Sequence, residues 1–346
     1  MNSLSFLTDM VTQPEVEIDL SRIDWNTLSY ARIHTRDCKV RERHTDFLNA
    51  MITGRRYFLK KQRTDSDGNT INPDLEMTRI SQIGDHPNII KCYGAVDIYK
   101  TKIQRTQING RYTILEYLKD SKDIREKEMT SLEKLVCLFL ISQSLRHMHS
   151  QDILNLDIKP GNILVNGKFV KMIDFEGAMR VSELETNKTR FSAPLYLSPE
   201  ALLVRDYGKY SDIYSLGAVI CDILMNDNQR SVDDIATKRE STKRIVPIMG
   251  RTKEETALHK YISGELDLIN YGVLDSSFTE EMVDKLAFDF SNPQALEELV
   301  ELVGSMLERD KDQRPEIDEV VDSMESIIAR DEILSKILEE RQKHAA

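Results

Sequence analysis

The sequence predicts an α+β protein with a small β-rich N-terminal lobe and a larger α-helical C-terminal lobe. Up to about residue 118, short apolar runs alternate with turns that contain Gly, Asn and Asp, which is typical of antiparallel strands. From residue 119 onward, longer segments repeat apolar residues at helical spacing. The chain of 346 residues, 40% hydrophobic and 30% charged, is long enough to build such a core in one or two domains.

The first lobe is expected at residues 26–118, after an N-terminal extension at residues 1–25. Its one helix should begin at Pro73, because Pro favours the first turn of a helix, and should end near Gly84. Strands are expected, in chain order, at residues 47–52, 57–60, 89–95 and 112–115. The first two strands would form a hairpin through a turn at Gly54.

The second lobe is expected at residues 119–346 and is predicted to be helical. Its helices are expected, in chain order, at residues 132–149, 214–224, 296–307 and 317–338. A longer polar insertion around residues 226–256 separates the second of these helices from the third. No internal repeat interrupts this order, so the chain does not belong to the repeat architectures.

Composition and charge argue against several classes of protein. The net charge of −11 disfavours a nucleic-acid binder that depends on a basic surface. The four cysteines lack metal-binding spacing, which is typical of free thiols in a reducing compartment. No apolar run approaches the roughly 20 residues of a transmembrane helix, and the N-terminus lacks the pattern of a secretory signal. We therefore expect a cytoplasmic protein, or a bacterial effector exported without such a signal into the cytoplasm of a host cell.

The most informative stretch is a polar segment at residues 155–164. Asp157 is followed by Lys159 and Asn162, and a second carboxylate, Asp174, ends the next apolar run. Phosphoryl transfer requires residues of these kinds: a carboxylate that orients the attacking hydroxyl, a cation near the moving phosphate, and an amide and a carboxylate that hold Mg²⁺. A lone Asp in a loop is usually a turn residue or a helix cap, so the inference depends on the whole set.

This set resembles the catalytic loop and the metal-binding loop of the eukaryotic-like protein kinases. The resemblance implies a bilobal kinase fold, ATP as the phosphate donor, and Mg²⁺ or Mn²⁺ held by Asn162 and Asp174. It also implies that Asp157 orients the substrate hydroxyl and accepts its proton. Lys159 lies in an Asp-Ile-Lys-Pro sequence, which is similar to the loop of Ser/Thr kinases rather than to that of tyrosine kinases.

The resemblance extends to the first lobe. Lys60 is similar to the kinase lysine that holds the α- and β-phosphates, and Glu76 would be its partner on the helix. Lys61 is the alternative, because strand alternation lets only one of the two face the nucleotide. The adenine would lie against the hinge and an apolar floor, for which the resemblance implies Leu115, Glu116, Leu118 and Leu164.

Three further residues resemble structural marks of the kinase second lobe. Residues 193–200 are similar to the end of the activation segment, where Glu200 is expected to form a buried ion pair with Arg314. Asp212 is similar to the kinase aspartate that braces the catalytic loop. These marks cover most of the second lobe and make a chance resemblance improbable.

The sequence also departs from the family pattern. No glycine precedes Gly54, so the glycine-rich loop that covers the phosphates is absent. Phe58 occupies a position beside the adenine that usually holds a small residue, and Leu156 replaces the Arg that usually receives an activation-segment phosphate. Smaller departures are Asn155, Glu176 and Ala193. Basic residues near the missing loop are expected to be solvated or to bind phosphates or another anion: Arg32, Arg36, Lys39, Arg41, Arg43 and His44.

The favoured interpretation is a divergent, atypical Ser/Thr protein kinase that phosphorylates protein substrates, with an anionic activator or a protein partner as a further expectation. The missing glycine loop and Phe58 favour one alternative, a pseudokinase that senses nucleotide or serves as a binding scaffold. A second alternative is a kinase-fold enzyme that acts on a lipid or a small molecule, or that transfers a nucleotide.

Overall fold

A computed structural model describes residues 29–30, 47–52, 54–63, 72, 74–103, 106–184, 196–225 and 276–345. Several predicted features lie outside the described residues: the extension at 1–25, the insertion around 226–256, the basic residues between 32 and 44, and Ala193.

The described residues fall into two compact units. Unit 1 contains the residues up to Asp85 and those from Ile90 to Asp120, and unit 2 contains His86–Ile89 and Ser121–His344. Unit 1 is built around an antiparallel sheet and unit 2 around packed helices, which confirms the predicted α+β class. The exact lobe boundaries at residues 26–118 and 119–346 stay predictions.

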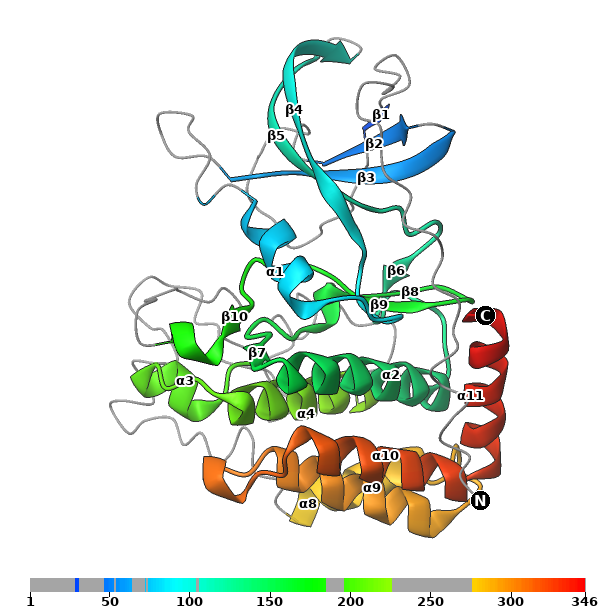
Figure 1. Cartoon of the computed structure of the whole chain (residues 1–346). Coiled ribbons are helices and arrows are strands. Elements are labelled where there is room, and N and C mark those ends of the chain that lie inside the picture. The colour runs from blue at the N-terminus through cyan, green and yellow to red at the C-terminus, as the bar shows by residue number, and fades with distance from the viewer. Residues whose placement is uncertain are drawn as a thin grey trace, which may run out of the picture. The chain divides into compact units, whose positions relative to one another are not determined.

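The sheet of unit 1 has the strand order β1-β2-β3-β5-β4, and all neighbouring strands are antiparallel. The strands are β1 (Ser29–Tyr30), β2 (Phe47–Ile52), β3 (Arg55–Lys61), β4 (Cys92–Ile103) and β5 (Thr106–Glu116). Strands β2 and β3 form the predicted hairpin, and Figure 1 shows β4 and β5 as a long twisted pair. The strand predicted from residue 89 begins later, at Cys92, because Ile89 forms an isolated bridge with Met172 in unit 2.

Strand alternation gives the sheet two distinct faces. One face carries the core of unit 1, an apolar cluster that consists of Leu48, Ala50, Ile52, Tyr57, Leu59, Val96, Ile98, Tyr112 and Ile114. The other face carries Phe58 and Lys60, which alternate with Tyr57 and Leu59 along β3. Leu115 belongs to the face of Lys60, because it pairs directly with Phe58 across the β3–β5 ladder.

Helix α1 (Leu75–Ile83) is the one described helix of unit 1. It buries Ile80 and Ile83 and ends at Ile83, next to Gly84, near which the sequence predicts its end. The residue before the helix, Asp74, has a φ of 63°, in the left-handed region that non-glycine residues rarely adopt.

Helices α2, α4, α9 and α10 pack on one another at the centre of unit 2 (Figure 1). The helices of this unit are α2 (Ser131–Ser150), α3 (Pro199–Val204), α4 (Lys209–Met225), α8 (Ser276–Leu286), α9 (Pro293–Met306), α10 (Ile317–Arg330) and α11 (Glu332–Ala345). The predicted helices at residues 132–149, 214–224 and 296–307 correspond to α2, α4 and α9. Helix α8 and the short helix α3 have no counterpart among the predicted helices.

The single helix predicted over residues 317–338 is wrong, because the chain breaks at Asp331 into α10 and α11. The Asp331 carboxylate accepts hydrogen bonds from the backbone N–H groups of Ser291 and Asn292, at 2.6 and 3.0 Å. It also accepts from the N–H groups of Ile333 and Leu334, both at 3.0 Å. Asp331 therefore caps the first turn of α11 and ties it to the loop before α9.

Short elements frame the polar segment of unit 2. They are β6 (Lys122–Asp123), β7 (Ile153–Leu154), β8 (Ile163–Val165), β9 (Val170–Met172), β10 (Met179–Arg180) and three 3₁₀ turns at Pro160–Asn162, Val181–Glu183 and Lys311–Gln313. Strand β8 pairs with β6 and β9, and β7 pairs with β10. No helix in the described part of the chain combines the length and the apolar character that crossing a bilayer demands.

Candidate functional site

The polar segment of unit 2 brings two predicted site residues, Lys159 and Asn162, into contact with a third, Asp157. Lys159 Nζ lies 2.6 Å from Asp157 Oδ2. Asn162 Nδ2 donates to the same oxygen and to the Asp157 backbone carbonyl, both at 2.9 Å. Because Lys159 and Asn162 both contact Oδ2, they orient the Asp157 side chain.

The second oxygen of this carboxylate is different. Asp157 Oδ1 is buried, and it has no hydrogen-bond partner among the described residues. A buried acceptor without a partner is rare in folded proteins, and it marks a position where a donor from a ligand would be favourable. The orphaned Oδ1 therefore suits the acceptance of a proton or a hydrogen bond from a bound hydroxyl.

Electrostatics supports this interpretation. Burial raises the pKa of Asp157 above its usual range, and the charge of Asp174 adds to the rise. Hydrogen bonding and charge from Lys159, together with the hydrogen bond from Asn162, oppose this shift. A carboxyl with a raised pKa is a stronger base than an ordinary Asp, as a proton acceptor in catalysis requires.

Asp212 on α4 braces the backbone that leads to Asp157. Its carboxylate accepts from the backbone N–H groups of Asn155 and Leu156, both at 2.8 Å, and lies 2.9 Å from His149 Nε2. Asp212 is fully buried, so these three contacts take the place of its hydration. The brace expected for Asp212 is thus present, whereas the sequence did not single out His149 on α2 as part of it.

Two departures from the family pattern have structural explanations. Asn155 is buried, and its Oδ1 accepts a 3.0 Å hydrogen bond from the backbone N–H of Asp157. Leu156 has a φ of 61° and packs in a buried apolar cluster with Leu154 and Met179. An apolar side chain thus lies where the resemblance implies a phosphate-binding Arg.

Asp174 follows β9, and its φ of 63° lies in the left-handed region. The backbone beside it is tied to the predicted metal-binding amide, because Ile173 N donates to the Asn162 carbonyl at 3.0 Å. No group of three or more His, Cys, Asp or Glu side chains in the described segments could hold a metal alone. Mg²⁺ is usually bound through one or two carboxylates plus substrate phosphates, and Asn162 with Asp174 fits such a partial oxygen site.

Unit 1 carries the predicted lysine and its partner. Lys60 Nζ lies 3.2 Å from Oε1 and 3.1 Å from Oε2 of Glu76 on α1. Glu76 is buried, with only 4% of its side chain exposed, and the Lys60 side chain is 16% exposed. Lys61, the alternative, belongs to the opposite face of β3, and its side chain lies beside Gly110.

The predicted adenine contacts fall on both units. In unit 1, Leu115 is buried, and the backbone N–H of Glu116 already donates to the Lys91 carbonyl at 2.9 Å. That N–H is therefore not available to a ligand. Leu118 follows β5 in the same unit, and Leu164 lies on β8 in unit 2.

Phe58 does not stand alone on the face of Lys60. Its ring stacks on Phe47 of β2, with the ring centroids 5.7 Å apart and the planes 19° apart. Asn49, which pairs directly with Phe58, has a buried Oδ1 without a hydrogen-bond partner in the described segments. A pair of aromatic rings thus covers part of the surface that the resemblance assigns to the adenine.

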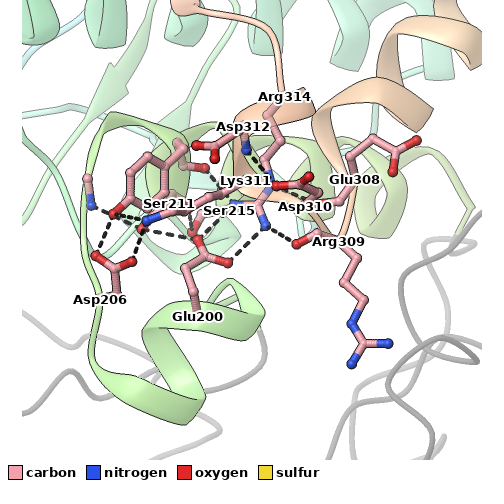
Figure 2. Close-up of polar contacts among 12 residues, drawn as sticks. Glu200, Asp206, Ser211, Ser215, Glu308, Arg309, Asp310, Lys311, Asp312 and Arg314 are labelled. Atoms are coloured by element: carbon pink, nitrogen blue, oxygen red, sulfur yellow. Dashed lines mark hydrogen bonds and ion pairs between the residues drawn. The ribbon is translucent and has the colours of Figure 1, made fainter.

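The expected ion pair between Glu200 and Arg314 is present in unit 2 (Figure 2). Arg314 Nη1 and Nη2 lie 2.8 and 2.9 Å from the two oxygens of Glu200, a bidentate arrangement. Although burial opposes it, hydrogen bonding from Arg314 lowers the pKa of Glu200. Lys311 and Asp206 form a second pair beside it, at 2.6 Å.

A family model described as the protein kinase domain matches residues 48–324. The chain is 28% identical over 194 residues to the interferon-induced, double-stranded RNA-activated protein kinase of Mus musculus. It is 33% identical over 150 residues to the serine/threonine-protein kinase Nek5 of Mus musculus, and 25% identical over 257 residues to the mitogen-activated protein kinase pmk-3 of Caenorhabditis elegans.

These matches cover 50%, 40% and 70% of this chain, respectively. They cover 36%, 22% and 52% of the lengths of the three relatives. The similarity is therefore to a part of each relative.

Proposed function

Because the chain belongs to the protein kinase family, we propose that it is a divergent Ser/Thr protein kinase that transfers the γ-phosphate of ATP to protein hydroxyls with Mg²⁺ or Mn²⁺. The observation that carries the proposal is the buried Asp157 carboxylate. Lys159 and Asn162 hold one of its oxygens, while the other has no hydrogen-bond partner in the described segments.

In the proposed reaction, Asp157 Oδ1 accepts a hydrogen bond from the substrate hydroxyl and orients its oxygen toward the γ-phosphorus. The new bond forms between this oxygen and phosphorus, the bond from phosphorus to the ADP oxygen breaks, and the hydroxyl proton passes to Asp157. Lys159 supplies a positive charge beside the moving phosphoryl group. Asp212 keeps the Asp157 backbone in position through its contacts to Asn155 and Leu156.

The remaining residues hold the donor. Lys60, oriented by Glu76, would bind the α- and β-phosphates. Asn162 and Asp174 would hold the divalent metal, which neutralises phosphate charge when bound. The preference for Ser/Thr is supported by Lys159 and by a relative that is named a serine/threonine-protein kinase.

The test uses ATP labelled at the γ-phosphate and, separately, at the α-phosphate. The wild-type chain should transfer only the γ-label to a generic protein acceptor in the presence of Mg²⁺ or Mn²⁺, and acid hydrolysis should release phosphoserine or phosphothreonine. Asp157→Ala and Asp174→Ala should each lose about 10²-fold or more of this transfer. Transfer of the α-label would instead identify a nucleotide transferase, and label in lipid or small molecules would contradict a protein substrate.

The stack of Phe58 on Phe47 favours one alternative, a pseudokinase that acts as a binding scaffold. Large rings on the face of Lys60 reduce the room for adenine. The same assay distinguishes the two functions, since a pseudokinase would transfer no label. If ATP also left the thermal unfolding midpoint unchanged, nucleotide sensing would be contradicted as well.

A further inference from the structure

Helix α1 begins in an unusual way. Asp at the residue before a helix normally caps it, because its carboxylate accepts from a backbone N–H of the first turn. Asp74 makes no such cap, and its φ of 63° is unfavourable for a residue with a Cβ. Strained backbone persists where surrounding contacts over-determine it, and it is common at functional positions.

The surrounding contacts of Asp74 come from the sheet of unit 1. Its Oδ1 and Oδ2 accept from Nε and Nη2 of Arg111 on β5, at 2.8 and 2.9 Å. Gln62, just after β3, donates from Nε2 to Asp74 Oδ1 at 2.9 Å and accepts from Asp74 N at 3.2 Å. Asp74 therefore joins α1 to the sheet through four hydrogen bonds.

The sheet side of this contact is itself well anchored. The backbone N–H of Gln62 donates to the Arg111 carbonyl at 2.9 Å, which extends the β3–β5 ladder by one bond. Arg111 Nη1 pairs at 2.7 Å with Asp97, which lies directly opposite on β4. The backbone bond places Arg111 and Gln62 side by side on the sheet, and Asp74 is the residue of α1 that both contact.

Glu76 follows Asp74 by two residues, in the first turn of α1, and pairs with Lys60 on β3. We propose that Asp74, Arg111 and Gln62 form a clamp that holds the start of α1 where Glu76 meets Lys60, so that these three act as positioning residues for phosphoryl transfer. The catalytic consequence rests on the proposed function, whereas the clamp itself does not. A rotation of α1 that separated Glu76 from Lys60 would first have to break the bidentate Asp74–Arg111 contact.

The experiment compares two clamp variants with one matched control in the full chain. Asp74→Asn removes the charge but keeps a residue that tolerates the left-handed region, and Arg111→Leu removes the cation. Asp97→Asn is the control, because it removes the other carboxylate on Arg111 and leaves Asp74 in place. Three readouts are recorded: hydrogen exchange of the α1 amides, acylation of the Lys60 amine by a lysine-selective reagent without nucleotide, and kcat with KM for ATP.

We expect exchange in α1 and acylation of Lys60 to be faster by about fivefold or more in both clamp variants, and kcat to fall about three- to tenfold. Asp97→Asn should stay within about twofold of wild type in all three. Unchanged exchange and acylation in Asp74→Asn would overturn the clamp, even if Arg111→Leu failed to fold. Faster exchange with an unchanged kcat would overturn its positioning role. A wild-type chain without phosphotransfer would defeat the proposed function, while exchange and acylation would still decide on the clamp.

Discussion

At the scale of the residue, the proposed chemistry depends on a few buried polar groups whose partners come from distant parts of the chain. Asp212 is the clearest case, because it is separated from Asn155 by 57 residues and from His149 by 63 residues. If Asp212 could not accept from the N–H groups of Asn155 and Leu156, those groups would be left buried without partners. The path of the segment that ends in Asp157 is thus set from α4.

Asp212→Asn should lower the free energy of unfolding by roughly 2–4 kcal/mol, because an amide nitrogen would face donors that a carboxylate oxygen now satisfies. Urea unfolding at neutral pH measures this change. The matched control is Asp322→Asn, since Asp322 is 73% exposed and lies 3.5 Å from Arg146. Its effect should stay within about 0.5 kcal/mol. Equal effects of the two substitutions would show that Asp212 does not brace the loop.

The pH dependence of the reaction should report on Asp157. An ordinary Asp has a pKa of about 3.9, and burial raises the pKa of Asp157. Because only the ionised carboxylate can accept a proton, kcat/KM should fall as the pH falls through this raised pKa. Lys159→Met removes a cation that opposes the rise in the pKa of Asp157. The acid limb of the pH profile of kcat/KM should therefore move to higher pH in this variant. Lys168→Met, at an exposed position, should leave the limb unchanged.

Residue spacing was sufficient to single out Asp157, Lys159 and Asn162, because all three lie within one short segment. Glu200 and Arg314 are 114 residues apart, and only the family resemblance indicated that they form an ion pair. The role of Asn155 was not predictable, because the hydrogen bond that its side chain accepts from the Asp157 N–H depends on the local backbone turn. The contact of Asp74 with Arg111 was missed because the two residues are 37 positions apart and no pattern in the sequence links them.

At the scale of the element, the break between α10 and α11 shows the limit of hydrophobic periodicity. Apolar residues at helical spacing continue past residue 331, and neither Gly nor Pro interrupts them. The break arises from Asp331, whose carboxylate accepts four backbone N–H groups from two separate segments. Sequence shows an Asp there, but only the tertiary structure shows what it holds.

Asp331→Ala should lower the free energy of unfolding by roughly 2–4 kcal/mol at pH 7, because four backbone N–H groups lose the carboxylate that accepts from them. Although burial opposes it, hydrogen bonds from Leu334 and Ser291 lower the pKa of Asp331. The pKa of an unfolded-state Asp is about 3.9. Because the folded-state pKa is lower, the stabilisation is present at pH values above the unfolded-state pKa and is lost as the pH falls through the folded-state pKa. The difference in the free energy of unfolding between wild type and Asp331→Ala should therefore shrink on acidification. A difference that stayed constant down to strongly acidic pH would contradict this prediction.

At the scale of the whole molecule, the predicted order of a β-rich part and a helical part is confirmed. The assignment of His86–Ile89 to unit 2 was not predictable, because these residues lie between α1 and β4 of unit 1. Their place follows from long-range contacts, such as the 2.7 Å bond from Met172 N to the Asn88 carbonyl. Such contacts leave no periodic trace in the sequence.

Unit 2 as a whole should depend on the Glu200–Arg314 pair, which joins α3 to the segment before α10 (Figure 2). Arg314→Met should cost about 3–5 kcal/mol, because Glu200 would keep a largely buried charge without its partner. Adding Glu200→Gln to this variant should recover part of the loss. Arg330→Met, which breaks the exposed pair with Glu298, should cost less than about 1 kcal/mol. Thermal unfolding of the wild type, the two single variants and the double variant provides the comparison. A double variant no more stable than Arg314→Met would contradict the prediction.

The proposed function requires Lys60 and Asp157 to serve the same phosphoryl transfer. The most direct test is a double-mutant cycle in kcat/KM with Lys60→Met, Asp157→Asn and the two combined. Residues that act as one catalytic unit are strongly non-additive, so the combined loss should fall at least about tenfold short of the product of the single losses. Single losses that simply multiply, or a Lys60→Met chain as active as wild type, would contradict the claim.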